Sequence, residues 1–439
     1  MFDLGVEGGV VVTSRGRRRS NVYVAGGRIA EAGPEARDAR ERVDASGLLV
    51  MPGMVDVHVH FMDPSATDRE DFPTASQAAA RTGVTTVVEH THSGPVRTAA
   101  DLHQKVEYLT GRSSVDFALG AHAWPGMARE VGPLWAAGAA FLKAFTCTTH
   151  GVPGHSPADL LALFRAAADS AAVCLVHCEE ESLTASAERA LRTAGRKDGG
   201  VIPAWRSREA ELVAVAGTAQ LARSTGARVV VAHASHPEAV AAARPNCLVE
   251  TCPQYLTLLE DEVIANGALR KFTPPARARD TADLDAMWEL LSSGAIDYVA
   301  SDHAPSTLAQ KRDGSIWDVH FGLPGVETTL PILLDGAGSG RLSYERVVAV
   351  YSEMPARIYG LHPRKGSLEP GADADLVLVD PERRWTVRDE DISSKAGWSP
   401  YSGRKLTGGA VRVFVRGGEP EPGVGTFLAG PGSAPRSPS

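Results

Sequence analysis

The sequence lacks several features that would assign it to other classes of protein. It contains no run of about 18 or more apolar residues, the length that a membrane-spanning helix needs. The arginines at positions 15 and 17–19 are not followed by the apolar core of a signal peptide. The net charge of −8 offers no basic excess for binding phosphate backbones. We therefore expect a cytoplasmic protein with no membrane partner and no nucleic-acid partner.

Cysteine is also scarce. The chain has 5 cysteines in 439 residues, an odd and widely spaced set, and none of them belongs to a CxxC pair. This usage favours reduced thiols over a disulfide framework. The hydrophobic fraction of 43% and the charged fraction of 22% are ordinary for a globular protein with a sizeable core.

The length predicts two domains. A chain of 439 residues exceeds the roughly 250–300 residues that one core usually serves. Residues 1–50 contain short strand-like runs separated by glycine, and a similar pattern returns over residues 366–417. We predict that these two ends form one small β-sandwich domain and that residues 51–365 form the larger domain. Residues 418–439 are a tail rich in Pro, Gly and Ser, and we expect about the last dozen to be disordered.

Within residues 51–365, apolar strand-like runs such as MVDVHVH and TTVVEH alternate with helical stretches such as PADLLALFRAAADS. Such alternation predicts an α/β fold with a parallel sheet. An open doubly wound sheet is the alternative, but no glycine-rich phosphate fingerprint follows the first strand. Polar residues gather at the carboxyl ends of many strands, which favours a (β/α)₈ TIM barrel.

Five of the strand-like runs end in residues that suit a metal site. These are His58 and His60 after the first run, followed by Lys143, His177, His233 and Asp302. His58 and His60 point to the same side because residues i and i+2 of a strand share a face. A lone strand histidine is usually a structural residue, but six candidates at equivalent strand ends would converge on one barrel mouth. The sequence therefore predicts a metal site.

Lys143 is unusual because an ammonium group repels metal ions and is costly in an apolar run such as FLKAF. Burial lowers the pKa of a lysine, and the neutral amine can add carbon dioxide. The resulting carbamate is an anion that can bridge two metal ions. The alternative is a lysine whose ammonium group extends to solvent.

Together these motifs resemble the cyclic amidohydrolases, the group of hydantoinases, dihydropyrimidinases, allantoinases and dihydroorotases. The resemblance rests on MPGMVDVHVH, FLKAF, VHCE, HAS, ETCPQYL, FTPPAR, SDHAP, GLPGVET, MPARIYGL and KGSLEPGADADLVLVD, which occur in the family's order. It covers residues 48 to 415. KAFTCTTHG, VHCEE and GWSPYSGRKLTGGAV look most similar to allantoinases.

The resemblance implies a two-metal hydrolase that opens the C–N bond of a cyclic amide, ureide or imide. His58, His60 and Asp302 would hold one ion, and His177 and His233 the other. Carboxylated Lys143 would bridge both ions together with a hydroxide. Asp302 would act as the catalytic base and then as the acid. The ions are expected to be Zn²⁺, with Mn²⁺, Fe²⁺ and Co²⁺ as alternatives.

Two departures from the family concern substrate recognition. Dihydroorotases place an arginine two residues after the second histidine, where it grips a carboxylate, but this chain has Met62 there. A carboxylate is then not recognised from that position, unless another arginine reaches in. The second departure is EHTHSGP, where relatives commonly carry an MP.N-type segment. His90 and His92 are candidates for contact with substrate there, or else they are hydrogen-bonded structural residues.

The resemblance implies further contacts with substrate. Thr273 and Gly322 with Leu323 fall where relatives hold the ring through backbone groups, and Thr148 and His150 fall where a loop residue assists the oxyanion. Thr148 and His150 are equally well explained as ordinary polar loop residues. ETCPQYL is expected to serve barrel packing rather than chemistry.

Two other functions stay open. The protein could be a specialised relative that acts on an unusual cyclic amide or in the ring-closing direction, for which the EHTHSGP segment is the motive. It could also be a non-catalytic oligomeric scaffold, although such relatives should lack the metal ligands that are present here. The resemblance also implies a homodimer or a homotetramer.

Overall fold

A closed barrel of parallel strands forms the larger part of the computed structural model, which describes residues 1–433. Its strands are β8 (Met54–Val59), β9 (Val84–Glu89), β10 (Asp116–Leu119), β11 (Ala121–His122), β12 (Leu142–Phe145), β13 (Val173–His177), β14 (Arg228–Val231), β15 (Leu248–Thr251) and β16 (Tyr298–Val299). Each strand pairs with the next in chain order, except that β10 and β11 do not pair with each other. Every residue of β8, β9, β12 and β13 is buried, as expected for strands covered on both faces.

The barrel closes between its first and last strands. Val59 at the end of β8 forms a bridge with His303, which follows β16, and His60 N–H donates to the His303 carbonyl at 2.7 Å. β10 and β11 are two pieces of one strand interrupted at Gly120, where a Cβ atom would lie 2.2 Å from the Phe141 ring. The predicted (β/α)₈ barrel is confirmed, and the open sheet is wrong because closure removes both sheet edges.

Helices surround the barrel, and several begin at side-chain caps that the sequence supplies. The side chains of Asp71, Ser156 and Ser207 accept backbone N–H groups at the starts of three helices, two of which carry Pro in the first turn. The helices are α1 (Phe72–Arg81), α2 (Ala99–Leu109), α3 (Val131–Ala137), α4 (Pro157–Ser170), α5 (Glu181–Thr193), α6 (Val201–Trp205), α7 (Arg208–Thr225), α8 (Pro237–Ala243), α9 (Pro253–Thr257), α10 (Glu260–Asn266), α11 (Thr281–Ser293), α12 (Leu308–Arg312), α13 (Thr329–Gly338), α14 (Tyr344–Val348) and α15 (Met354–Ile358). Shorter helical turns cover Ala128–Glu130, Gly267–Arg270, Ala349–Glu353, Asp389–Asp391 and Pro431–Ser433.

The two ends of the chain form a small β domain beside the barrel. Its strands are β1 (Phe2–Glu7), β2 (Val10–Thr13), β3 (Gly16–Arg19), β4 (Asn21–Ala25), β5 (Arg28–Gly33), β6 (Ala39–Asp44), β7 (Leu49–Pro52), β17 (Leu376–Thr386) and β18 (Lys405–Phe414). One sheet has the order β5-β4-β1-β6, and the other has the order β18-β17-β7-β2-β3. β17 from the C-terminal part pairs antiparallel with β7 from the N-terminal part. The predicted meeting of the two ends is confirmed.

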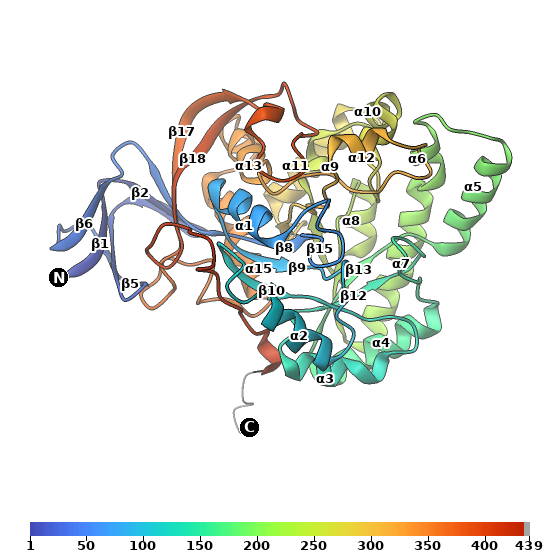
Figure 1. Ribbon diagram of the computed structural model, residues 1–439, viewed down its shortest axis with the longest axis horizontal. Coiled ribbons are helices and arrows are strands. Elements are labelled where there is room, and N and C mark those ends of the chain that lie inside the picture. The colour runs from blue at the N-terminus through green and yellow to red at the C-terminus, as the bar shows by residue number, and fades with distance from the viewer. Residues whose placement is uncertain (434–439) are drawn as a thin grey trace.

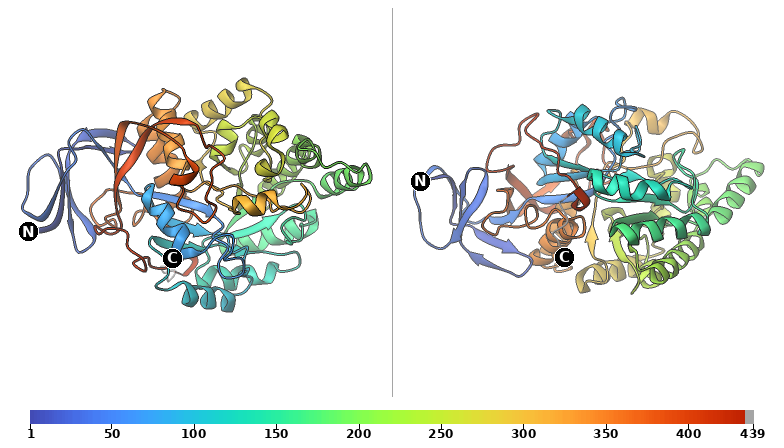
Figure 2. Two further views of the ribbon diagram at one scale, coloured as in Figure 1. Left: turned by 45° about the horizontal axis from the view of Figure 1, so that its top comes forward. Right: turned by 90° about the horizontal axis from the view of Figure 1, so that it is seen from below.

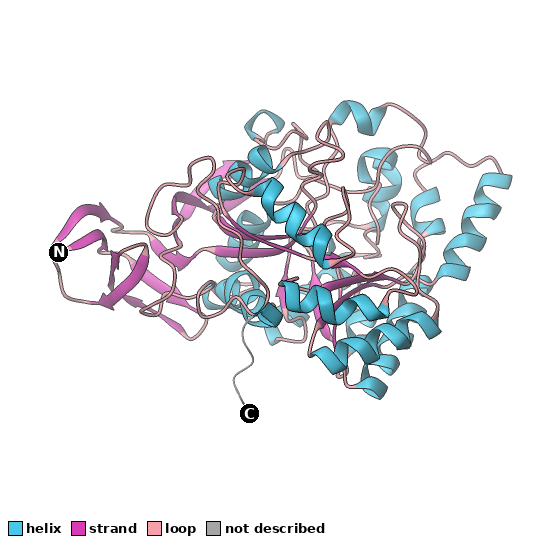
Figure 3. Ribbon diagram, turned by 60° about the horizontal axis from the view of Figure 1, so that its bottom comes forward, coloured by secondary structure: helices cyan, strands magenta, loops and turns pink. Residues whose placement is uncertain are grey.

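The figures show the same arrangement from several sides. The N-terminal strands lie at one end of the molecule and the barrel helices α4, α5 and α7 at the other (Figure 1). In the further views, β17 and β18 lie between the N-terminal sheet and the barrel (Figure 2). Colouring by secondary structure shows strands at the N-terminal end and helices crowded around the barrel (Figure 3). Among the described residues, no helix combines the length and the apolar character needed to cross a membrane.

The C-terminal tail differs from its sequence-based description. Phe117 of β10 forms a parallel bridge with Phe427, and Leu428 N–H donates to the Phe117 carbonyl at 2.7 Å. Leu428 is buried, and Gly430 N–H donates to the Gly138 carbonyl. The expectation of disorder is therefore wrong for residues 428–433, because the tail pairs with a barrel strand. Residues 434–439, to which the same expectation applied, lie outside the described residues.

Candidate metal centre

The six side chains predicted to form a metal site lie together at the carboxyl ends of the barrel strands. All six line one cavity of about 350 Å³. They are His58 and His60 at the end of β8, Lys143 in β12, His177 at the end of β13, His233 after β14 and Asp302 after β16. The alignment of successive parallel strands brings together residues that are 244 positions apart in the chain, from His58 to Asp302 (302 − 58).

His58, His60 and Asp302 form the first cluster. The Nε2 atoms of His58 and His60 lie 3.3 Å and 3.4 Å from the same Asp302 carboxylate oxygen, Oδ1. Burial lowers the pKa of His60 and lowers the pKa of His58 well below its ordinary value, so both imidazoles are neutral at physiological pH. Neutral ring nitrogens and a carboxylate oxygen are good ligands for zinc and similar divalent ions.

His177 and His233 form the second cluster. The Nδ1 atom of His177 lies 3.1 Å from the Nε2 atom of His233. The other ring nitrogen of His177 lies 2.7 Å from a carboxylate oxygen of Glu179, which fixes Nε2 as the protonated nitrogen. The lone pair of His177 Nδ1 therefore points at His233, where a cation can be held between the two rings.

Lys143 is buried beside both clusters. Its Nζ atom has no hydrogen-bond partner among the described residues. Burial lowers the pKa of Lys143 to about 8, which makes the neutral amine accessible near physiological pH. The side chain does not extend to solvent, so the alternative reading of an exposed ammonium group is wrong.

Glu250 of β15 orients the His58 ring and also contacts the backbone of His233. The sequence did not predict this role, because ETCPQYL was assigned to packing. Its Oε1 atom lies 2.7 Å from His58 Nδ1 and accepts the backbone N–H of His233 at 3.0 Å. Its Oε2 atom accepts the Tyr298 hydroxyl at 2.8 Å. With His58 Nδ1 engaged, His58 Nε2 is left to face the centre. The sequence did offer a signal for this role, because Glu250 is a carboxylate within a largely buried parallel strand.

Glu179 plays the same part for His177 and is held by two buried arginines. Arg277 donates to Glu179 Oε1 at 2.6 Å, and Arg206 donates to Oε2 at 3.2 Å. The Thr273 hydroxyl also donates to Oε2, at 2.6 Å. Burial alone would raise the pKa of Glu179, but the two arginines and His177 hold that pKa well below its ordinary value. Glu179 is therefore ionised and can accept the Nε2–H of His177.

These donors fit divalent metal ions. Two ring nitrogens face each other, and two more face one carboxylate oxygen, while Lys143 Nζ is buried without a partner. The ring nitrogens of His58 and His60 also lie within 4.8 Å of one in His90. Without cations, such a set leaves buried polar atoms unsatisfied, which is costly.

The structure brings five of the eight predicted substrate contacts to the cavity wall: Met62, His92, His150, Thr273 and Gly322. His90, Thr148 and Leu323 are not among the residues that line it. His90 stacks on His58 with ring centroids 3.6 Å apart and bonds the Val57 carbonyl, and the Leu323 carbonyl accepts Ala304 N–H. Thr148 is exposed, and its Oγ1 accepts Gly154 N–H.

Backbone strain is concentrated at the cavity. Met62, His150, His233 and Asp302 have φ values between 39° and 60°, in the left-handed region that non-glycine residues seldom adopt. All four line the cavity. Such conformations cost on the order of 1–3 kcal/mol each and persist at sites where side-chain direction matters.

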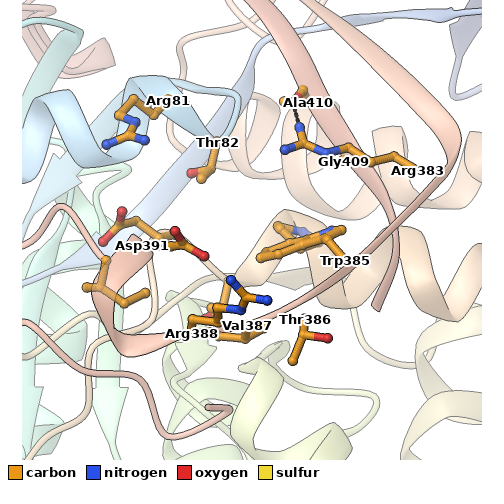
Figure 4. A pocket seen from close by; sticks show the side chains of 14 residues that line it. Arg81, Thr82, Arg383, Trp385, Thr386, Val387, Arg388, Asp391, Gly409 and Ala410 are labelled. Carbon is orange, nitrogen blue, oxygen red and sulfur yellow. Dashed lines mark hydrogen bonds between the residues drawn. The ribbon is translucent and has the colours of Figure 1, made fainter. Parts of the chain in front are cut away.

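A second and larger cavity, of about 480 Å³, lies apart from the metal centre. Figure 4 shows the Trp385 ring with Arg383 and Arg388 around it. Its lining contains no histidine or cysteine, and it shares no residue with the cavity of the metal centre. The ligand set for a metal ion therefore lies at the barrel mouth and not here.

Residues 49–418 match the Amidohydrolase family. The chain belongs to this family. The match spans the barrel together with β7, β17 and β18 of the small domain, so it includes every residue of the two clusters. Family membership and the histidine clusters agree on a centre for divalent metal ions.

Relatives of this amidohydrolase carry several substrate names. It is 36% identical over 430 residues to an allantoinase of Rubrobacter xylanophilus, covering 95% of this chain and 93% of the relative. It is 37% identical over 402 residues to a dihydroorotase of Halobacterium salinarum, covering 89% and 91%. The solved L-hydantoinase (dihydropyrimidinase) of Arthrobacter aurescens superposes with a TM-score of 0.93 at 32% identity, covering 98% and 100%. Overall similarity therefore does not distinguish among these substrates.

Proposed function

We propose that this amidohydrolase opens the C–N bond of a cyclic amide, ureide or imide by adding water at a two-metal centre. One observation carries the proposal: two clusters of neutral imidazoles, each with one ring oriented by a buried carboxylate, lie beside a buried lysine at the mouth of the barrel. Orientation of ligands by outer carboxylates is typical of metal sites in proteins. It has no evident purpose in a scaffold that binds no metal.

His58, His60 and Asp302 would hold one ion, His177 and His233 the other, and carboxylated Lys143 would contact both. Bound divalent ions, most simply Zn²⁺, would lower the pKa of a water molecule and polarise the amide carbonyl. Mn²⁺, Fe²⁺ and Co²⁺ suit the same nitrogen and oxygen donors.

Asp302 is the residue placed to move the proton. Its side chain is 14% exposed at the cavity and has no neighbouring arginine or lysine within 4.0 Å among the described residues. Its carboxylate would take a proton from the attacking water and return it to the leaving ring nitrogen. The positive φ of Asp302 aims the side chain at His58 and His60.

The cavity wall supplies the fit to a small ring. Apolar side chains of Met62, Phe145, Phe272 and Phe321 line it, and its volume of about 350 Å³ suits a small cyclic amide. Gly322 N–H donates to the Lys271 carbonyl, so a substrate contact there would use the Gly322 carbonyl oxygen. A side chain at this position is excluded, because a Cβ atom would lie 2.2 Å from the Ala304 carbonyl oxygen.

The proposal is tested by turnover of metal-loaded protein with allantoin, hydantoins, dihydropyrimidines, dihydroorotate and cyclic imides. Bound metal is quantified in the same samples, and the ring-opened products are tested for ring closure. We expect two ions per chain, loss of turnover on chelation and recovery when the metal is restored. Metal-loaded protein that converts none of these compounds in either direction would contradict the function and favour the specialised relative. Protein that binds no metal would favour the scaffold.

The family resemblance supports a homodimer or a homotetramer as the assembly. Light scattering on the eluate of a size-exclusion column gives the mass directly. A mass of twice or four times 46.3 kDa is expected, and a single-chain mass contradicts the proposal.

A further inference from the structure

Arg69 lies at the wall of the same cavity as the metal centre, in the loop between β8 and α1. Its Nε–H donates to the Pro305 carbonyl oxygen and to the Ser306 hydroxyl oxygen, both at 3.1 Å. These two acceptors follow Asp302 by three and four residues. One edge of the guanidinium group is therefore fixed to the loop that carries Asp302.

The other edge of the Arg69 guanidinium group is free. Within the part of the chain that the structure describes, its two terminal nitrogens make no hydrogen bond, and no carboxylate lies within 4.0 Å of them. The neighbouring Asp68 accepts instead from the side-chain amide of Gln310 at 2.7 Å. Burial lowers the pKa of Arg69 to about 10, so its charge is kept at neutral pH.

Other cations near the metal centre have partners. Arg206 donates to Glu179, and Lys271 donates to the Val319 carbonyl at 2.6 Å. Besides Lys143, Arg69 is the one lysine or arginine among the described residues that line this cavity. A partly buried guanidinium group without an anion is costly, and its planar fork matches a carboxylate. The two terminal nitrogens of Arg69 are therefore available to an anionic group of a ligand in this cavity.

We propose that Arg69 binds an anionic group of the substrate, and that this enzyme prefers cyclic amides with a carboxylate on a short side group. This inference rests on the proposed function of the same cavity. Met62 and Arg69 both line the cavity, one apolar and one charged. The carboxylate is recognised from the loop between β8 and α1, seven residues beyond the position that Met62 occupies.

A matched pair of substrates tests the inference. Hydantoin-5-acetate and its neutral amide differ in one charged group, and their kcat/KM values are measured with metal-loaded protein. In wild-type protein we expect kcat/KM to be higher for hydantoin-5-acetate than for the amide. In Arg69→Met the ratio of the two kcat/KM values should fall at least tenfold, because KM for the acetate rises. A merely structural Arg69 would lower both values together and leave the ratio unchanged.

Arg346→Met is the matched control. Arg346 also donates to backbone carbonyls, of Leu291 and Ile296, but it does not line the cavity. The ratio should be unchanged in this variant. An equal ratio in wild-type protein and in Arg69→Met would overturn the inference, while turnover of both compounds would leave the proposed function intact.

Binding separates this inference from the proposed function. Calorimetry with metal-loaded protein compares N-carbamoyl-aspartate with N-carbamoyl-asparagine, the ring-opened forms of the two compounds. We expect the aspartate derivative to bind at least tenfold more tightly, and Arg69→Met to abolish the difference. If wild-type protein binds N-carbamoyl-aspartate and N-carbamoyl-asparagine with equal affinity, the inference is wrong, whether or not any hydantoin is hydrolysed.

Discussion

At the scale of single residues, surroundings decide what a side chain can do. Lys143 occupies a strand position where a long polar side chain is costly, yet it has neutral imidazoles around it rather than a carboxylate partner within hydrogen-bonding distance. Burial that disfavours its ammonium form favours the neutral amine that carbon dioxide can modify. The burial that makes the ammonium form of Lys143 unfavourable is therefore also what makes its amine reactive.

Lys143→Ala should lose metal and activity together. Turnover should fall on the order of 100-fold or more, because the change removes a ligand of both ions. A short carboxylic acid such as acetate should restore part of it by occupying the vacated space. Bound metal and turnover are measured for this variant with and without acetate. Lys311→Ala, which removes a buried lysine outside the cavity, serves as the control, and full activity in Lys143→Ala would refute the carbamate.

Glu250→Gln should weaken metal binding without removing a ligand. Glutamine keeps the shape, but its neutral amide oxygen is a weaker acceptor than a carboxylate oxygen, so the protonated Nδ1 of His58 is held less firmly. The loss in affinity should be about 10–100-fold, and excess metal should restore turnover. Competition with a chelator measures the affinity. Glu209→Gln on the exposed part of α7 is the control, and equal affinity in both variants would contradict the orienting role.

At the scale of elements, the carboxyl ends of the strands carry the site and other segments hold the strands in place. The segment 426–428 runs beside β10 and supplies hydrogen bonds to it at Phe117. This segment therefore supports the barrel where β10 gives way to β11. A Pro- and Gly-rich composition conceals the role, because the pairing partner is about 310 residues away in the chain.

Leu428→Ala tests the contribution of this segment. Leu428 is buried against the barrel, so its truncation should lower the free energy of unfolding by about 2–5 kcal/mol. Denaturant titration measures the change. Val411→Ala, at a side chain that is 47% exposed, should change stability by no more than about 0.5 kcal/mol. An unchanged unfolding midpoint for Leu428→Ala would mean that the segment is not needed for stability.

At the scale of the whole molecule, one buried ion cluster joins the barrel to the small domain. Lys365 donates to Asp116 of β10 at 2.5 Å and to Asp375 at 2.7 Å, and it lies 3.0 Å from Asp373. Burial lowers the pKa of Lys365, but the three carboxylates outweigh this effect and raise it. Its stabilising contribution is therefore present at neutral pH and is lost as the pH rises above the ordinary value of 10.5.

Lys365→Met should lower the free energy of unfolding by about 3–5 kcal/mol, because it removes a cation shared by three buried carboxylates. Asp116 and Asp373 keep ion pairs with Arg416 and Arg364, but Asp375 is left without a cation. Adding Asp375→Asn should recover part of the loss by removing one of those charges. Denaturant titration at pH 7 compares the single and double variants. Equal stability of wild-type protein and Lys365→Met would show that the cluster does not join the two domains energetically.

Sequence patterns alone were enough to predict the barrel, the joining of the two ends and the six candidate ligands. Hydrophobic periodicity is local, and polar residues at strand ends mark the mouth of a parallel barrel. The domain boundaries near residues 50 and 365 and the roles of the ligands remain predictions. Three features could be seen only in the folded chain: Glu250 and Glu179 orient His58 and His177, the tail pairs with β10, and Arg69 lines the cavity. These contacts join segments far apart in the chain, and their distances and directions follow from packing rather than from any local pattern.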